Sequence, residues 1–300
     1  MWLRNKKIMV THSGRFHADD VFAIALLRMV PEWKAAKLIR TRDEEIIKKA
    51  DLVVDVGGIY NPAQNRFDHH QTGGALNYEN GIPYSGLGLV WKQFGEQVCG
   101  SKEVAQMITE KLVQQIDAMD CGLSIETPNI VGVAEYVMDD MTDAFNPSWK
   151  EKNYDRDKAF NEASKIAGRV LEREIKKTKD KLEARILVDK AYKASTDKKI
   201  IVLDQYLPGQ EILMNYPEPV FVIHPHTVPG TWAVKVISAE KGTFKARKDL
   251  PKAWAGKRDE ELAKLSGVAD ARFCHNALYI GVAGSKEGAI KMAQIALTIN

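Results

Sequence analysis

Short hydrophobic runs alternate with amphipathic, helix-like stretches at the start of the chain. Three runs are typical of buried strands: Lys7 to Thr11 (KIMVT), Lys37 to Arg40, and Leu52 to Val56 (LVVDV). Between them, Asp19 to Met29 carries apolar residues at helical spacing, and Asp43 to Ala50 is a short charged helix. This β-α-β-α-β order predicts a doubly wound parallel sheet, whose ligands bind at the carboxyl ends of the strands.

The middle of the chain is predicted to be helical. A Gly/Asn-rich loop at 73–83 precedes a helix from Ser85 to Phe94, and a longer helix covers Glu103 to Met119. Phe145 to Lys150 is a connector, and Asp155 to Lys193 is a long, highly charged helix. We expect this helix to pack one face on the body of the protein or to link two domains.

Strand-like runs return from Lys199 onward. The segments KIIVLD, PVFVIH and TWAVKVI read as strands, Phe273 to Gly281 as a further strand, and Lys286 to Leu297 as a helix. This part of the chain therefore predicts a second, smaller α/β domain. We expect an α/β protein in three parts, at 1–145, 146–194 (a helical connector) and 195–300.

The composition excludes several classes of protein. Of the 300 residues, 45% are hydrophobic and 28% charged, which is typical of a globular chain and not of a disordered or collagen-like one. No apolar run is long enough to span a membrane, and the first residues lack the hydrophobic region of a secretory signal. Cys99, Cys121 and Cys274 form no CxxC pair, so we expect neither a disulfide framework nor a thiolate zinc site, and we expect a cytoplasmic location.

Charge is unevenly distributed along the chain. The net charge of +3 is too small to argue for nucleic-acid binding. However, Asp51 to Asp143 contains 14 acidic and 4 basic residues, whereas Lys241 to Arg272 contains 9 basic and 5 acidic residues. The first region is suited to hold cations, and the second is suited to hold an anion.

Histidines and aspartates follow the predicted strands of the first sheet. They are His12, His17, Asp19, Asp55, Asp68, His69 and His70, followed by Asp117 and Asp120 on a helix. Side chains at separate strand ends can converge on one point above the sheet, where imidazole and carboxylate groups bind a divalent cation without cysteine. With this many ligands the site could hold two ions, an arrangement suited to displacement at phosphorus.

Four ordered segments resemble the motifs of the DHH phosphoesterase superfamily: HSGRFHADD, VVDVGG, FDHHQ and IDAMDCG. The finer resemblance is to the melanocyte-proliferating-gene branch, also described as metal-dependent hydrolases or exonucleases. Three later segments support it, at His224 to Trp232, Phe244 to Gly256 and Phe273 to Ile280. The resemblance implies a doubly wound, DHH-like catalytic domain at 1–145 and a substrate-binding domain at 195–300.

The resemblance also implies a metal site. Its expected ligands are His12, His17, Asp19, Asp55, His69 and Asp117. His17 stands where the superfamily has an aspartate, and Asp120 is the alternative to Asp117 for the last ligand. Asp20 is either a charge at a helix N-terminus or a further ligand. Mn²⁺ is the expected ion, although such a donor set also accepts Zn²⁺, Fe²⁺ or Co²⁺.

The remaining candidate residues concern the substrate. The resemblance places His70 beside the substrate phosphate, with Asp68 orienting the imidazoles. Arg247 is expected to bind phosphoryl oxygens in a bidentate manner. The further substrate-binding candidates are His275, Arg258 and His224. Alternatively, the basic residues of this region form a solvated face, and Trp232, Trp254 and Tyr279 belong to a core rather than stacking on a base.

The function implied by the resemblance is metal-dependent phosphodiester hydrolysis, as a 3′-to-5′ exonuclease on short or single-stranded RNA. The alternatives are a small-nucleotide phosphatase or pyrophosphatase, a non-catalytic RNA-binding protein with a structural metal, and a metal-dependent hydrolase of a non-phosphate substrate. No membrane partner is expected. The oligomeric state is open, a homodimer being one option.

Overall fold

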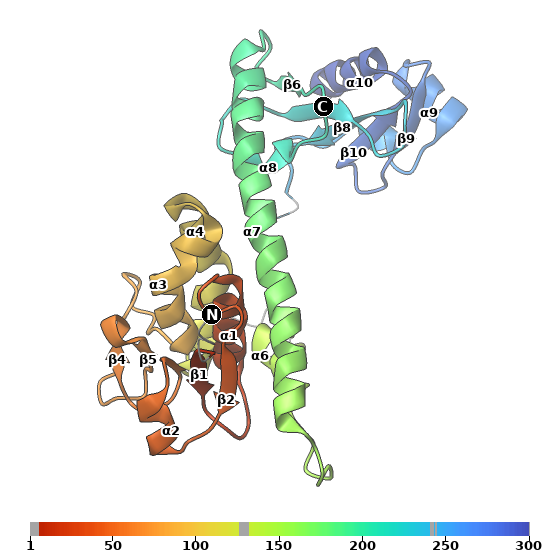
Figure 1. Cartoon of the computed structure of the whole chain (residues 1–300). Helices are drawn as coiled ribbons and strands as arrows, with labels where there is room; N and C mark the ends of the chain where they lie inside the picture. The colour runs from red at the N-terminus through yellow and green to blue at the C-terminus, as the bar shows by residue number, and fades with distance from the viewer. Residues whose placement is uncertain (1–5, 126–131, 241–242, 244, 300) are drawn as a thin grey trace. The chain divides into compact units, whose positions relative to one another are not determined.

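The computed structural model describes residues 6–125, 132–240, 243 and 245–299. The chain forms two compact units, unit 1 (Met1–Lys179) and unit 2 (Asp180–Asn300) (Figure 1). Their boundary lies within the helix α7 (Arg156–Ala194). The expected division at 1–145, 146–194 and 195–300 stays a prediction, and the protein is of the α/β class that the sequence predicted.

Unit 1 is built on a five-stranded sheet with the strand order β2-β1-β3-β5-β4. The strands are β1 (Ile8–Thr11), β2 (Lys37–Arg40), β3 (Leu52–Val54), β4 (Tyr60–Asn61) and β5 (Arg66–Phe67). All neighbouring pairs are parallel except the edge pair formed by β4 and β5. The three predicted strands are confirmed. The strands β4 and β5 were not predicted, because two-residue strands are too short to show a hydrophobic period.

The helices of unit 1 are α1 (Ala18–Met29), α2 (Glu44–Lys49), α3 (Gly86–Cys99), α4 (Lys102–Ile108), α5 (Gln114–Asp120), α6 (Met138–Asp143) and the first part of α7, with a 3₁₀ turn at Pro62–Gln64. Every residue of α1 from Ala18 to Leu27 is buried. A helix that is buried all round lies at the centre of a core. Indeed, α1 packs against α3, α5, α6 and β3, which fixes its N-terminus beside the strand ends.

The predicted helix from Glu103 to Met119 contains a π-helical turn at Thr109–Val113, between α4 and α5. The hydroxyl of Thr109 donates to the carbonyl oxygen of Ala105 (2.9 Å) and accepts the indole N–H of Trp91 (2.8 Å). A threonine hydroxyl that bonds the carbonyl four residues back competes with the backbone ladder. This buried pair of bonds coincides with the start of the π turn.

Unit 2 contains a second five-stranded sheet, with the order β6-β7-β8-β10-β9. Its strands are β6 (Ile200–Val202), β7 (Phe221–Pro225), β8 (Trp232–Val236), β9 (Ala271–Cys274) and β10 (Ile280–Ala283). Only β6 and β7 run parallel. Its helices are the last part of α7, α8 (Gly209–Leu213), α9 (Asp259–Ser266) and α10 (Lys286–Thr298), with a 3₁₀ turn at Lys252–Trp254.

The single strand predicted from Phe273 to Gly281 is wrong, because this segment forms the hairpin of β9 and β10. The N–H of His275 donates to the carbonyl oxygen of Ile280 (2.9 Å), and Leu278 has a φ of 58°. Apolar residues on both sides of Asn276 continue the hydrophobic run through the turn, so the pattern gave no sign of the break.

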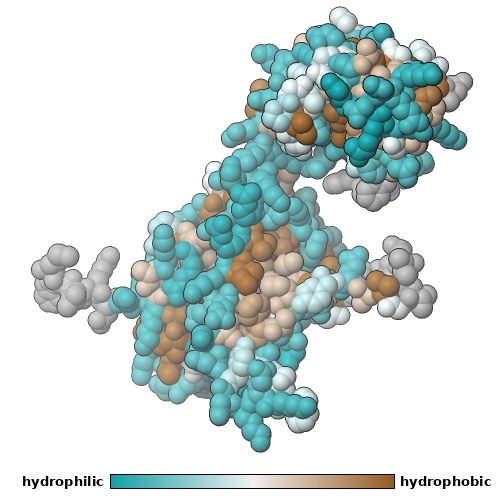
Figure 2. Space-filling model, turned by 90° about the vertical axis from the view of Figure 1, so that its right-hand side faces the viewer, coloured by the Kyte–Doolittle hydropathy of each residue, from teal (hydrophilic) through white to brown (hydrophobic). Residues whose placement is uncertain are grey.

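The face of the protein shown in Figure 2 is mainly hydrophilic, with hydrophobic residues in patches on unit 1. Among the described residues of unit 1, four large hydrophobic side chains are more than half exposed: Ile59 (54%), Val133 (61%), Tyr136 (71%) and Trp149 (88%). Among the described residues, no helix is both long and apolar enough to cross a membrane.

Candidate metal centre

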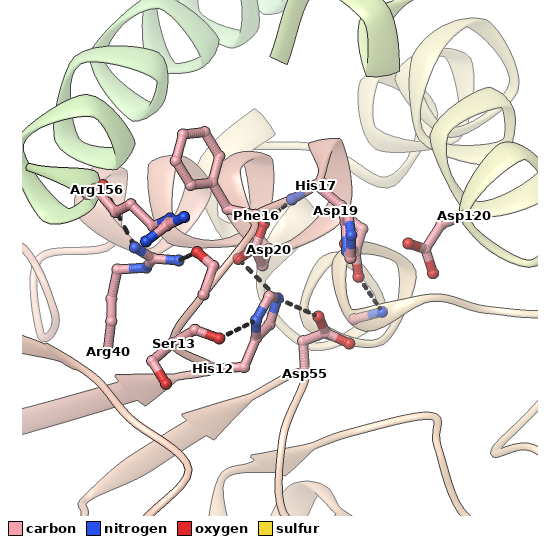
Figure 3. Close-up of polar contacts among 12 residues, drawn as sticks. His12, Ser13, Phe16, His17, Asp19, Asp20, Arg40, Asp55, Asp120 and Arg156 are labelled. Atoms are coloured by element: carbon pink, nitrogen blue, oxygen red, sulfur yellow. Dashed lines mark hydrogen bonds and ion pairs between the residues drawn. The ribbon is translucent and has the colours of Figure 1, made fainter. Parts of the chain in front are cut away.

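The candidate site of unit 1 lies at the carboxyl edge of the first sheet (Figure 3). His12 follows β1, Asp55 comes directly after β3, and the segment 68–70 follows β5. Because these three strands are parallel, their carboxyl ends meet at one edge. The N-terminus of α1 and the C-terminus of α5 bring further aspartates to the same edge, so the topology gathers the predicted residues as the sequence indicated.

Asp55 stands between three imidazoles. One of its carboxylate oxygens, Oδ2, lies 3.3 Å from Nε2 of His12, and the other, Oδ1, lies 3.2 Å from Nε2 of His69 and 3.4 Å from Nδ1 of His70. The residue has a φ of 56°, in the left-handed region that costs a side-chain-bearing residue about 1–3 kcal/mol. This strain at a residue that links three histidines is typical of a functional site.

Asp20 connects the first two histidines. Its Oδ1 accepts the backbone N–H of His17 at 2.9 Å, and its Oδ2 lies 3.1 Å from Nε2 of His12. Nδ1 of His12 lies 3.2 Å from the carbonyl oxygen of Ser13. Since a carbonyl only accepts, Nδ1 carries the proton of the neutral ring, and Nε2 presents a lone pair to two carboxylates. That arrangement needs either a second proton or a cation.

Among the described residues there are four groups of three potential ligands. Within each group, the ligand atoms all lie within 4.8 Å of one another, and the groups share members. They are His12–His17–Asp55, Asp55–His69–His70, His69–Asp120–Cys121 and His17–Asp19–Asp120. Because each group shares a residue with another, they form one continuous cluster, which we call the metal cluster. The structure thus brings together five of the six predicted ligands.

Several atoms of the metal cluster are buried without a hydrogen-bond partner among the described residues. They are Nε2 of His12, Oδ1 of Asp19, Oδ2 of Asp20, Oδ1 of Asp55 and Nε2 of His69. A buried polar group without a partner costs about 1–3 kcal/mol, and folded proteins rarely keep such groups. A divalent cation would satisfy all of these atoms, and their imidazole and carboxylate chemistry fits one.

The charges of the cluster shift the pKa values of its members strongly. Burial lowers the pKa of His12, but contacts with Asp20 and Asp55 outweigh burial and raise the pKa to about 10. Burial also opposes protonation of His69, yet Asp55, Cys121 and Asp120 raise its pKa to about 10. Burial and the neighbouring carboxylates raise the pKa of Asp19 well above its usual range. Without a cation, the cluster therefore holds protons in the place of metal charge.

Asp117 lies outside the groups that make up the metal cluster, and its role as the last ligand stays a prediction. Its Oδ1 accepts the hydroxyl of Ser85 (2.6 Å) and the N–H of Gly88 (3.0 Å), and its Oδ2 accepts the hydroxyl of Tyr78 (2.7 Å). Asp120, the alternative, lies 3.3 Å from Nε2 of His69. Asp117 instead fixes the N-terminus of α3.

The N-terminus of α3 packs directly on the metal cluster. The N–H of Gly86 donates to Oδ2 of Asp19 at 3.1 Å. A Cβ atom at Gly86 would lie 2.9 Å from that oxygen and 3.0 Å from Cβ of Asp55, so only glycine fits this approach. The network that holds α3 thereby also positions Asp19.

His70 differs from the other imidazoles because its side chain is 62% exposed. Its Nδ1 lies 2.7 Å from Oδ1 of the buried Asp68, whose Oδ2 accepts the N–H of Gly58. The hydrogen bond to Asp68 raises the pKa of His70. The ring is thus held at the edge of the cluster, with its other nitrogen free of contacts with the described residues. The contact between Asp68 and His70 fits the predicted orienting role of Asp68, which stays a prediction.

Arg40 is a residue of this site that sequence reasoning missed. Its side chain is 2% exposed, and its guanidinium donates to the carbonyl oxygen of Gly14 (2.9 Å) and to Asp157 (3.0 Å). The rings of Phe16 and Phe160 lie 5.2 and 4.6 Å from its central carbon. Arg40 therefore ties α7 to the loop between His12 and His17. Its place at the end of a strand was the signal in the sequence.

The substrate-binding candidates of the second half of the chain all lie in unit 2. The guanidinium of Arg247 donates to the carbonyl oxygens of Pro219 (2.8 Å) and Met214 (2.9 Å), so it holds the backbone of its own unit. Arg258 lies over the ring of Phe273, 4.7 Å from its centroid. The binding roles of Arg247 and Arg258 stay predictions.

The histidines and aromatic candidates of unit 2 divide between core and surface. His224 is buried, and burial lowers its pKa. The ring of His275 lies 4.5 Å from that of Tyr279, which is 39% exposed. Trp254 is 1% exposed and belongs to the core, as the alternative interpretation held. The binding roles of His224 and His275 stay predictions.

One protein-family model matches nearly the whole chain. The model of MYG1_exonuc, described as Uncharacterised protein family (UPF0160), matches residues 8–297. The chain belongs to the MYG1 exonuclease family. This confirms the resemblance that the four motifs and three later segments indicated. The match covers both units, including the metal cluster of unit 1 and the candidate residues of unit 2.

Curated members of the MYG1 exonuclease family are similar over nearly the full chain. The MYG1 exonuclease of Homo sapiens is 31% identical, over 96% of this chain and 85% of its own. The MYG1 exonuclease of Mus musculus is 33% identical, over 96% and 84%. The MYG1 protein of Caenorhabditis elegans is 31% identical, over 96% and 94%.

Among solved structures, a pGpG-specific phosphodiesterase from Vibrio cholerae, PggH, covers 97% of this chain and 98% of its own at 14% identity. The TM-score is 0.34. We therefore describe the fold of this MYG1 family member from its own strands and helices alone.

Proposed function

We propose that this protein is a metal-dependent phosphodiesterase that removes nucleotides from the 3′ end of short or single-stranded RNA. The observation that carries the proposal is the set of buried imidazole and carboxylate atoms without hydrogen-bond partners at the carboxyl edge of the first sheet. The exonuclease names of the human and mouse relatives support the substrate class.

Six residues of the metal cluster would hold the metal: His12, His17, Asp19, Asp55, His69 and Asp120. A divalent ion bound there supplies charge neutralisation at the phosphoryl group and a lowered pKa for the attacking water. We propose Mn²⁺, and the series of overlapping ligand groups supports a pair of ions. The same donors also suit Zn²⁺, Fe²⁺ or Co²⁺.

The chain's own contribution beyond metal binding centres on His70. Asp68 accepts from its Nδ1 and raises its pKa, which favours the protonated ring, whose other nitrogen is then also a hydrogen-bond donor. Such a donor, held rigidly at the edge of the cluster, stabilises the negative charge that grows on a phosphoryl oxygen during displacement. Asp55, in its left-handed conformation, keeps the imidazoles of His12 and His69 at fixed distances.

The test is turnover of a 5′-labelled short RNA by the purified full chain with Mn²⁺. We expect a ladder of products shortened from the 3′ end, abolished by chelator. Asp55→Asn should remove the activity, whereas Asp51→Asn, an exposed carboxylate directly before β3, should retain it. Release of phosphate alone, or turnover of mononucleotides but not of longer chains, would instead support a small-nucleotide phosphatase. Absence of any metal-dependent turnover of phosphodiesters would contradict the proposal.

We further propose a cytoplasmic location, supported by Cys99, Cys121 and Cys274 being free thiols in the structure. Fractionation of cells that express the tagged full chain tests this location.

A further inference from the structure

A cavity of about 630 Å³ opens in unit 1 beside α2. Its lining consists of Arg42, Glu44, Ile47, Lys48, Val56, Gly57, Ile59, Gln64 and Arg66. This volume lies within the range of roughly 300–1,000 Å³ that is usual for small-molecule sites. None of these residues belongs to the metal cluster.

The cavity exists because one face of the first sheet is thinly covered. The helix α2 has only 6 residues, and none of them is buried. Beneath it lies a small apolar cluster whose buried members are Val10, Ala50, Val53 and Val56. A longer helix would fill the space next to this cluster. Here the apolar side chains of Ile47 and Val56 instead form part of a cavity wall.

Two loops connect the cavity to the metal cluster. Val56 and Gly57, which line the cavity, directly follow Asp55, and the next residue, Gly58, donates its N–H to Asp68. On the other side, Nε of Arg42 donates to the carbonyl oxygen of Ser13, the residue after His12, at 3.4 Å. One side of the cavity lining is therefore continuous with the loops that carry His12 and Asp55 of the metal cluster.

The charge of the lining favours an anion. It includes three cationic side chains and one carboxylate, that of Glu44. The guanidinium of Arg66 is held by the carbonyl oxygens of Gln64 (3.0 Å) and Ala50 (2.9 Å). Within the described part of the chain, neither Arg42 nor Arg66 forms an ion pair. Burial lowers the pKa of Arg66, and the nearby carboxylate of Asp51 acts against this shift. The charge of Arg42 is thus left without a carboxylate partner, and guanidinium groups recognise phosphate well.

The apolar part of the lining favours a flat organic body next to that anion. Ile47 and Val56 form one part of the wall, and Ile59 is 54% exposed although it lines the cavity. Gly57 has a φ of 97°, and a Cβ atom there would lie 3.2 Å from Ile47, so the wall has no room for a side chain at this position. A phosphate joined to an aromatic heterocycle combines both requirements.

We propose that this cavity binds a nucleotide through its phosphate and base. In the proposed phosphodiesterase function, on which this role rests, the occupant is a nucleotide of the substrate next to the one processed at the metal cluster. Arg42, Lys48 and Arg66 contact the phosphate, and the isoleucines contact the base. Lys48 pairs with Glu44 and Glu45 only at the exposed surface, where a phosphate can replace them.

The experiment measures binding of AMP, adenosine and inorganic phosphate by calorimetry to the full chain in chelator, so that the metal cluster takes no part. We expect saturable binding of AMP, and weaker binding of adenosine and of phosphate alone. Lys48→Glu should weaken AMP binding about tenfold or more, because a charged hydrogen bond becomes a repulsion. The matched control is Lys49→Glu, a neighbouring exposed lysine with a similar surface ion pair that does not line the cavity.

A second pair of variants tests the apolar wall. Ile59→Glu should weaken AMP binding, whereas Ile46→Glu, an exposed isoleucine outside the lining, should not. No saturable AMP binding by the wild type, equal loss in Lys48→Glu and Lys49→Glu, or equal affinity for AMP and phosphate would each overturn the proposal. Since no turnover is measured, AMP binding without metal-dependent hydrolysis would keep the cavity proposal and contradict the proposed function alone.

Discussion

One carboxylate oxygen of Asp20 lies 3.1 Å from Nε2 of His12, while the other accepts the backbone N–H of His17 at 2.9 Å. A single side chain thus accepts the backbone N–H at the start of α1 and faces one imidazole of the metal cluster. One buried aspartate therefore connects the cap of the helix to a candidate metal ligand.

Asp20→Asn should therefore weaken metal binding more than it weakens the fold. The amide keeps an oxygen for the N–H of His17 but loses the charge that faces His12. We expect about 10–100-fold lower affinity for Mn²⁺, as for other changes to groups that orient metal ligands. The control is Asp140→Asn, because Asp140 accepts the N–H of Val137 in the same way at the exposed start of α6. Equal metal affinities of the two variants would show that Asp20 is only a cap.

If Asp120 and not Asp117 is the metal ligand, the same substitution at the two positions should affect metal content differently. Asp120→Asn removes a carboxylate 3.3 Å from His69, so the purified protein should bind less metal, by about tenfold in affinity. Asp117→Asn keeps an acceptor for Ser85 and Gly88, so its metal content should match the wild type. Elemental analysis of both proteins decides. Loss of metal from Asp117→Asn but not from Asp120→Asn would restore the first expectation.

Metal binding should release protons. In the metal-free protein the pKa values of His12 and His69 are about 10, so both rings are protonated at neutral pH. Only the neutral imidazole binds a metal, so about one proton must leave each ring, and the apparent affinity should rise with pH. Calorimetry in buffers of different ionisation enthalpy measures the release, and His69→Ala should lower it. An affinity independent of pH between neutrality and pH 9 would contradict these shifts.

The sequence predicted those helices and strands that show a hydrophobic period over several consecutive residues. The strands β1, β2 and β3 and the helix α1 have hydrophobic patterns of several residues, and their order implied where the histidines would meet. The hairpin at Phe273–Gly281 and the π turn at Thr109 were missed for a common reason. Each is set by one or two local hydrogen bonds within an otherwise continuous hydrophobic pattern.

Spacing alone could not decide between the two aspartates of IDAMDCG. Both lie on one face of the helix, and the choice depends on which one meets Ser85 and Tyr78 from another segment. Arg40 was missed because the sequence does not show its burial between Phe16 and Phe160. Such contacts between distant segments are fixed by packing, which a pattern of single residues does not contain.

Arg40→Lys should destabilise unit 1, although it keeps the charge. A lysine cannot bond Gly14 and Asp157 together, and it would lose the stacking of the guanidinium on Phe16 and Phe160, where the Arg40 side chain is only 2% exposed. We expect a free energy of unfolding lower by about 2 kcal/mol. Arg15→Lys, at an exposed ion pair with Asp143, should change it by less than about 1 kcal/mol. Denaturant unfolding of the metal-free proteins compares them, and equal stabilities would show that the guanidinium fork is dispensable.

The pH dependence of stability should reveal the buried Asp117. Burial raises its pKa to about 7, against a usual value of 3.8, even though Ser85, Tyr78 and Gly88 donate to it. A raised pKa means that the folded protein binds the proton more tightly than the unfolded chain does. The contribution of the bound proton on Asp117 to the free energy of unfolding is therefore complete below pH 3.8. It is lost as the pH rises towards 7.

Asp117→Asn, which carries no titrating proton, provides the reference for this effect. In chelator, the free energy of unfolding of the wild type should fall relative to the variant by up to about 1.4 kcal/mol per pH unit between roughly pH 4 and pH 7, and then level off. Urea unfolding across this range measures the difference, and other titrating groups cancel because both proteins contain them. A difference that stays constant with pH would mean that Asp117 is ionised in the folded protein, held by its three donors alone.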